Sequence, residues 1–303
     1  MNSLTSLDRR QLLLAAGAAA LGSTVSPLHA QTAWPSKPIR FVVPFAPGGT
    51  SEIVARSVAA ELTKQLGHNV FVENKPGGAG VVAMIDVAKA APDGHTLILG
   101  HVGTLAVNPY MLANQPYDVN KDFIPVTLLA KVPNVFVVHT DVPARNFKEF
   151  VAYVKKNPGQ LNYGSAGNAS AGHLAMEYLK LVTGMYITHI PYRGTGPQLT
   201  DLLAGRTQAS SAGLPALSAH IKSGKLRAIA VGTQQRISHL LCAGESLLRP
   251  LGQRPQHSRI QPGGYVAVVT ARRSRRLRLD ALDVLRLRQR RLTLIERQVR
   301  LAC

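Results

Sequence analysis

Short apolar runs alternate with helix-like segments along the first third of the chain. Residues 39–44 form a β-branched run, and Ser51 then opens a segment with apolar residues at helical spacing. A second unit repeats this order, with a strand over 69–73, a helix over 81–89 and a strand over 96–99. The order strand, helix, strand, helix, strand is typical of a parallel sheet covered by helices.

The same alternation resumes after Lys131. Strands are predicted over 134–139 and 161–163, and helices over 147–156 and 170–183, with further alternation over 186–231.

Both halves carry glycine-rich loops after their strands, and ligands of open parallel sheets bind at the carboxyl ends of strands. We therefore predict an α/β protein of two lobes facing a ligand cleft, each lobe a mainly parallel sheet flanked by helices. The first lobe is expected at residues 31–131 and the second at 132–236.

Two strand-to-helix loops, residues 45–50 and 74–80, place glycine where the backbone must approach something closely. Amides in such loops, together with the partial positive charge of a helix N-terminus, make an anion site without a fixed cation. Tight turning alone also explains each loop taken singly. Two such loops on one lobe, with similar loops on the other, favour a carboxylate, because four or five charged hydrogen bonds of roughly 1.5–3 kcal/mol each could support micromolar binding.

Catalytic motifs fit the same loops poorly. Residues 78–83 match only the loose dinucleotide pattern, and the segment 164–167 lacks the glycine that precedes the serine in a nucleophile elbow. The ten histidines show no metal-ligand spacing, so His173 is interpreted as a capping or packing residue. We predict no enzyme activity, no cofactor and no metal, and we keep a secreted hydrolase based on Ser165 as an alternative.

Residues 1–30 have the pattern of an export signal. Arg9 and Arg10 precede a short apolar stretch over 12–21, and Ala30 supplies a small residue for cleavage. The paired arginines permit a twin-arginine route, although Sec signals can also contain them. The apolar stretch is far shorter than the ~20 residues of a membrane span, so a soluble periplasmic product beginning near Gln31 is expected.

The charge of the chain is concentrated at its end. The 35 Lys and Arg against 16 Asp and Glu give +19, of which residues up to Arg236 carry 21 − 12 = +9 and the last 67 carry 14 − 4 = +10. All basic residues after Arg236 are arginine, and Lys, Asn, Phe and Met are absent there. We interpret this as a shifted reading frame from near Ile237; the alternative is an Arg-rich extension for nucleic acid or an anionic membrane.

Eight motifs follow one another in order between residues 34 and 236. They lie at 34–40, 44–49, 72–80 (VENKPGGAG), 92–97, 162–167 (NYGSAG), 189–194 (HIPYRG), 201–205 and 224–231. Together they resemble the Bug receptors of tripartite tricarboxylate transporters. The resemblance implies a monomeric, type II-like periplasmic binding protein that closes on a small carboxylated solute and serves membrane subunits of a transporter, with no nucleic-acid partner.

The same resemblance implies ligand contacts in loops of both lobes. The implied contact residues are Phe45, Ala46, Pro47, Gly48, Gly49, Thr50, Gly77, Gly78, Ala79 and Thr104 on the first lobe, and Ser165, Ala166, Gly167, Asn168, Arg193, Gly194 and Thr195 on the second. For Arg193, a carboxylate clamp and a merely exposed side chain both remain open.

The chain departs from the resemblance after Ile237. Such receptors continue with a return strand and C-terminal helices that complete the first lobe, and nothing of the kind is recognisable here. We therefore expect the end of the first lobe to be lost, residues 237–303 to be disordered or poorly packed, and an uncovered sheet edge to promote aggregation.

Overall fold

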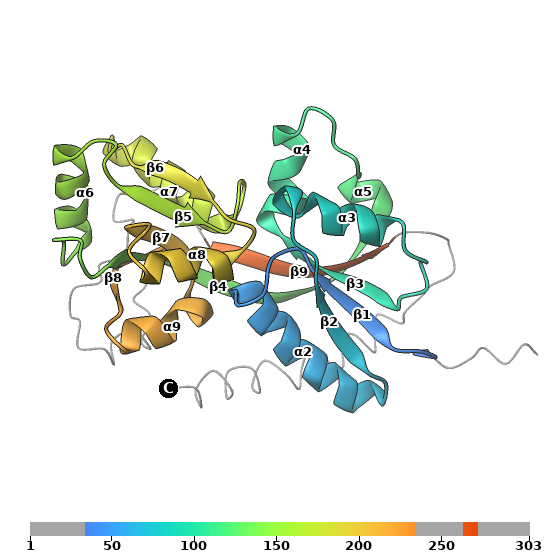
Figure 1. Cartoon of the computed structure of the whole chain (residues 1–303). Helices are drawn as coiled ribbons and strands as arrows, with labels where there is room; N and C mark the ends of the chain where they lie inside the picture. The colour runs from blue at the N-terminus through green and yellow to red at the C-terminus, as the bar shows by residue number, and fades with distance from the viewer. Residues whose placement is uncertain (1–33, 234–262, 272–303) are drawn as a thin grey trace, which may run out of the picture. The chain divides into compact units, whose positions relative to one another are not determined.

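One long strand, β4 (Phe123–His139), belongs to two sheets (Figure 1). The computed structural model describes residues 34–233 and the backbone of 263–271. Contacts divide the chain after Ser36, and everything below concerns the unit that begins at Lys37. The first part of β4 pairs with β9 in one sheet, and its last residues pair with β7 and β8 in the other.

The first sheet has the order β2, β1, β3, β9, β4. Strands β1 (Ile39–Val43), β2 (Val70–Asn74) and β3 (Thr96–His101) run parallel, whereas β9 (Gly263–Ala271) is antiparallel to both of its neighbours. The helices of this half are α2 (Thr50–Leu66), α3 (Val81–Ala88), and the short α4 (Asn108–Met111) and α5 (Val119–Asp122), with one-turn segments η1 (Gly78–Gly80) and η2 (Gly103–Val107).

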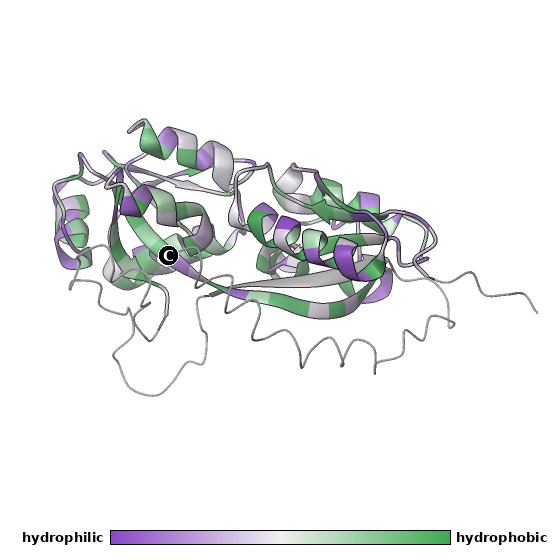
Figure 2. Ribbon diagram, turned by 90° about the horizontal axis from the view of Figure 1, so that it is seen from below, coloured by the Kyte–Doolittle hydropathy of each residue, from purple (hydrophilic) through white to green (hydrophobic). Residues whose placement is uncertain are grey.

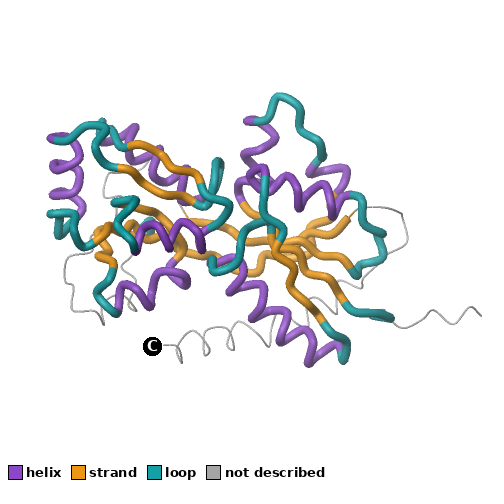
Figure 3. Tube along the Cα trace, viewed as in Figure 1, coloured by secondary structure: helices purple, strands orange, loops and turns teal. Residues whose placement is uncertain are grey.

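The second sheet continues from β4 through β7 (Ala209–Gly213) and β5 (Asn162–Ser165) to β6 (Thr188–Pro191), with β8 (Leu226–Val231) on the other side of β4. Strands β5, β6 and β7 are parallel to one another. The helices of this half are α6 (Phe147–Lys156), α7 (Ala171–Thr183), α8 (Thr195–Leu203) and α9 (Leu214–Lys222), as the tube in Figure 3 shows.

Each sheet is buried by amphipathic helices. The helices carry polar and apolar residues side by side, whereas β4 is largely apolar (Figure 2). In the first half, Ala55 and Ala59 of α2 pack on Phe41 of β1. In the second half, Met176 of α7 packs in a cluster with Phe150 of α6. The α/β architecture and the predicted alternation of elements up to residue 231 are confirmed.

Charged residues join three elements at the outer part of the first sheet. The Arg40 guanidinium on β1 bonds the carboxylates of Glu73 on β2 and Asp86 on α3, and Lys75 Nζ lies 2.6 Å from Asp86 Oδ1. Burial alone would raise the pKa of Asp86, but hydrogen bonds from Lys75 and Arg40 lower it below its usual value. This network fixes α3 against the sheet.

Two features differ from the sequence predictions. The strand predicted over 134–139 is only the end of β4, which begins at Phe123. The expectation that no return strand follows Ile237 is wrong, because β9 fills the place between β3 and β4. The predictions for residues 1–30, and for the tail outside 263–271, fall beyond the described residues.

Candidate functional site

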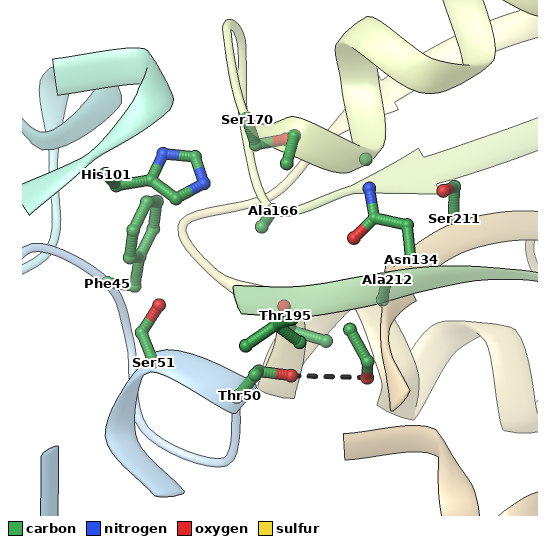
Figure 4. A pocket seen from close by; sticks show the side chains of 15 residues that line it. Phe45, Thr50, Ser51, His101, Asn134, Ala166, Ser170, Thr195, Ser211 and Ala212 are labelled. Atoms are coloured by element: carbon green, nitrogen blue, oxygen red, sulfur yellow. Dashed lines mark hydrogen bonds between the residues drawn. The ribbon is translucent and has the colours of Figure 1, made fainter. Parts of the chain in front are cut away.

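Four helix N-termini converge on one cavity (Figure 4). The wall includes Gly49, Thr50 and Ser51 at the start of α2, the first residues of α7, Thr195 at the start of α8, and Gly213 before α9. These helices have 17, 13, 9 and 9 residues, long enough for each to bring a partial positive charge to its first turn. The cavity therefore has an electropositive wall made of backbone.

The first amides of three of these helices are not capped by a side chain. No side chain caps α2, α8 or α9, and only at α7 does a side chain, Ser170, accept from a backbone amide, that of His173 at 3.3 Å. None of the 15 lining residues is Lys, Arg, Asp or Glu. An anion here would be held by amides and dipoles without a counter-charge.

An aromatic pair forms one side of the cavity. The rings of Phe45 and His101 meet edge to face with centroids 5.1 Å apart. Burial lowers the pKa of His101 to about 4, so its imidazole is neutral at pH 7. Since the Gly103 amide donates to its Nδ1 at 3.0 Å, the ring proton lies on Nε2, which Figure 4 shows turned toward the cavity.

Polar side chains from the second sheet form the opposite side. Asn134 of β4 and Ser211 of β7 are 4% and 1% exposed and both line the cavity. The Ser211 Oγ has no hydrogen-bond partner among the described residues. The cavity volume is about 60 Å³, so the space between the two sides is small.

Loops of the two halves touch beside the cavity. The Ala46 amide donates to the Arg193 carbonyl at 2.9 Å, and Thr50 Oγ1 donates to the Gly213 carbonyl at 3.2 Å. A Cβ on Gly194 would lie 2.8 Å from the Ala46 amide, and one on Gly103 would lie 2.8 Å from the Ala169 carbonyl. The structure is therefore closed, with glycines where the two halves meet.

Comparison with known proteins gives this cavity a context. A family model described as the tripartite tricarboxylate transporter family receptor matches residues 54–243. The chain belongs to that family. It is 37% identical to the protein BugT of Bordetella pertussis over 221 residues, which are 73% of this chain and 68% of BugT.

Solved structures agree with the family assignment. The chain is similar to the R. palustris protein Rpa4515 solved with adipate (33% identity, TM-score 0.72, 79% of this chain and 78% of that chain covered). It is also similar to MatC from Rhodopseudomonas palustris with bound malate (29% identity, TM-score 0.70, 79% of each chain covered). The predicted two-lobed periplasmic binding protein fold and the resemblance to Bug receptors are confirmed.

The structure brings five of the predicted site residues of this family member to the cavity wall. They are Phe45, Gly49, Thr50, Ala166 and Thr195.

Five further predicted residues lie in the loop contact instead of the wall. The amides of Ala46 and Gly48 already donate, to the Arg193 carbonyl and to the Glu52 carboxylate. Pro47 and Gly194 pack against the opposing loop, and the Arg193 side chain is exposed. These positions join the two halves, and a direct ligand contact from any of them stays a prediction.

The remaining predicted residues are placed around the cavity or away from it. Gly77, Gly78 and Ala79 lead into α3, and the Ala79 carbonyl accepts from Asn108 at 3.2 Å. Thr104 is buried against the His101 backbone. Ser165 and Gly167 are buried and bonded to each other, whereas Asn168 is exposed. None of these seven residues lines the cavity.

Ser165 is placed as a structural residue. It is fully buried, and its Oγ lies 2.6 Å from His189 Nε2. Burial, assisted by the neighbouring His173, lowers the pKa of His189 to about 4. The hydroxyl lies inside the protein, away from the cavity wall, so the geometry favours a role in holding the 165–170 loop over one as a hydrolase nucleophile.

Several lining residues were missed by sequence reasoning. They are Ser51, His101, Val132, Asn134, Ser170, Ala171, Gly172, Ser211, Ala212 and Gly213. His101 and residues 211–213 lie at the carboxyl ends of the parallel strands β3 and β7. Because ligands of open parallel sheets bind at these ends, their position in the sequence could have predicted them as site residues. Asn134 lies in the middle of β4, where no local pattern marks it.

Among residues 34–233 and 263–271, no helix has the length and apolar character needed to cross a membrane. No group of three or more His, Cys, Asp or Glu side chains there is placed to hold a metal ion.

Proposed function

We propose that this chain is a periplasmic receptor that captures a small carboxylate-bearing solute in the cavity for the membrane subunits of a tripartite transporter. The observation that carries the proposal is the convergence of four helix N-termini on a cavity with no charged wall residue. Family membership and similar structures with adipate and malate support a carboxylate. The predicted export signal supports the periplasmic location.

The amides supply enough energy for such a role. Hydrogen bonds to a charged group contribute roughly 1.5–3 kcal/mol each net, and helix termini add up to about 1 kcal/mol each where they are exposed. Three uncapped N-termini at α2, α8 and α9 could together offset the ordering cost and leave the ~8 kcal/mol of a micromolar complex. The closed contact between loops would then shield the carboxylate from water.

Calorimetric titration of the mature chain against short carboxylates and their neutral amides tests the proposal. We expect carboxylates to bind and the corresponding amides to bind at least tenfold more weakly. Thr195→Glu places a carboxylate at the cavity end of α8 and should abolish binding. Thr200→Glu puts the same change on the exposed side of the same helix and should leave binding intact. Equal binding of acids and amides, or equal effects of the two variants, would overturn the proposal.

A further inference from the structure

We propose that Ser211 binds a hydroxyl group of the ligand, so that the receptor prefers a hydroxycarboxylate to the same acid without the hydroxyl. This inference rests on the proposed function and specifies it further. Its starting point is the Ser211 hydroxyl, which is 1% exposed, lines the cavity and has no partner among the described residues. Buried hydroxyls nearly always have a partner, so this one marks a place where a ligand atom arrives.

The sheet register puts a second neutral polar group beside it. Asn134 of β4 pairs with Gly213 of β7, and Phe136 pairs with Ser211. Because side chains alternate along a strand, Asn134 and Ser211 project from the same face of the sheet, diagonally opposite each other. Figure 4 shows both side chains on one side of the cavity. A hydroxyl, which both donates and accepts, suits a serine and an amide together.

The opposite side offers a donor without a charge. The His101 ring is neutral and carries its proton on the nitrogen that faces the cavity. The carboxylate is assigned to the helix N-termini, and the hydroxyl of the ligand to these neutral hydrogen-bonding groups.

The test is calorimetric titration of the mature chain with hydroxy acids and with the matched acids that lack the hydroxyl, lactate against propionate and malate against succinate. We expect the hydroxy acid of each pair to bind at least tenfold more tightly, since a site built around a hydroxyl rejects the analogue without it.

Two serine variants separate recognition from folding. Ser211→Ala should weaken lactate roughly 10- to 100-fold and leave propionate unchanged, which removes the preference. Without ligand, its melting temperature should stay the same or rise, because an unpartnered buried hydroxyl is lost. Ser218→Ala, at a half-buried position of α9 outside the cavity wall, should alter neither quantity.

The outcomes distinguish this inference from the proposed function. Carboxylate binding without preference for the hydroxyl, or a preference that survives in Ser211→Ala, would overturn the inference alone. No binding of any carboxylate would overturn the proposed function together with the inference.

Discussion

The substitution Gly196→Ala should weaken ligand binding without destabilising the fold. Gly196 is the second residue of α8, where it faces the loop of the other half. A Cβ at this position would lie far inside 3.0 Å of the Pro47 carbonyl oxygen and would also press on Gly48. Because both obstacles are backbone atoms, no rotamer change relieves the clash, and the two loops must move apart.

The cost to the closed state follows from two contributions. Overpacking of this kind costs typically 1–3 kcal/mol, and separating the loops loses the bond from the Ala46 amide to the Arg193 carbonyl, worth about 0.5–1.5 kcal/mol. The sum of roughly 1.5–4.5 kcal/mol falls on the ligand-bound closed state. The dissociation constant should therefore rise roughly 10- to 1,000-fold.

The free energy of unfolding of Gly196→Ala should not fall together with its ligand affinity. Alanine is favoured over glycine inside a helix by about 0.8–1 kcal/mol, so a chain with separated loops gains in α8. The control is Gly224→Ala, whose left-handed backbone (φ +71°) has nothing within 4 Å and whose strain costs roughly 1–2 kcal/mol. Urea melts and calorimetry should show lost affinity with retained stability for Gly196→Ala, and the reverse for Gly224→Ala. Unchanged affinity in Gly196→Ala would refute the loop contact as part of the binding state.

Three further predictions concern stability. Burial lowers the pKa of His101 from 6.5 to about 4, so the unfolded chain takes up this proton first. The free energy of unfolding should therefore fall between about pH 6.5 and pH 4, with up to about 3 kcal/mol of the fall due to His101. In urea melts His101→Gln should make this fall smaller without abolishing it, because the pKa of His189 is also lowered to about 4. Asp86→Asn breaks the ion pairs that hold α3 and should cost about 1 kcal/mol in urea melts after allowance for partial exposure, whereas Asp141→Asn at an exposed site should cost under about 0.5 kcal/mol. Truncation after residue 233 removes β9 and should cause aggregation in light scattering, whereas truncation after residue 271 keeps β9 and should leave the protein monomeric; identical behaviour of the two truncations would contradict this.

Hydrophobic periodicity was sufficient to predict the longer helices and most strands, but not the short helices α4 and α5. The repeat in α7, for example, places Ala175, Met176 and Leu179 on one buried face, and such a stripe is visible in sequence. The start of β4 was missed because its residues pair with β9 without a clean alternation of burial, and because Pro125 and Pro133 interrupt the run. Register shifts near Pro125 accommodate the proline, which local rules place at irregular points of a strand.

The candidate site could be predicted only in part. A glycine-rich loop shows that something approaches the backbone closely, but the sequence does not say what. Gly49 lines the cavity, yet a Cβ added there would meet Thr195 of the other half, and one added at Gly194 would meet the opposing loop at Ala46. Ser211 and Asn134 meet only through the pairing of β7 with β4, which is a tertiary relation between distant segments. The helix N-termini were foreseen because caps and starts are local features.

Strand β9 changes how the arginine-rich tail should be interpreted. A β ladder is held by backbone hydrogen bonds, so a segment with alternating β-branched residues can fill the place between β3 and β4 whatever the origin of its reading frame. The aggregation expected from an open edge between those strands therefore does not apply while β9 is present. The shifted-frame interpretation keeps its support from composition and from the family match, which ends at residue 243. Any destabilising effect of the tail must then arise outside residues 263–271, and the pair of truncations separates these two parts.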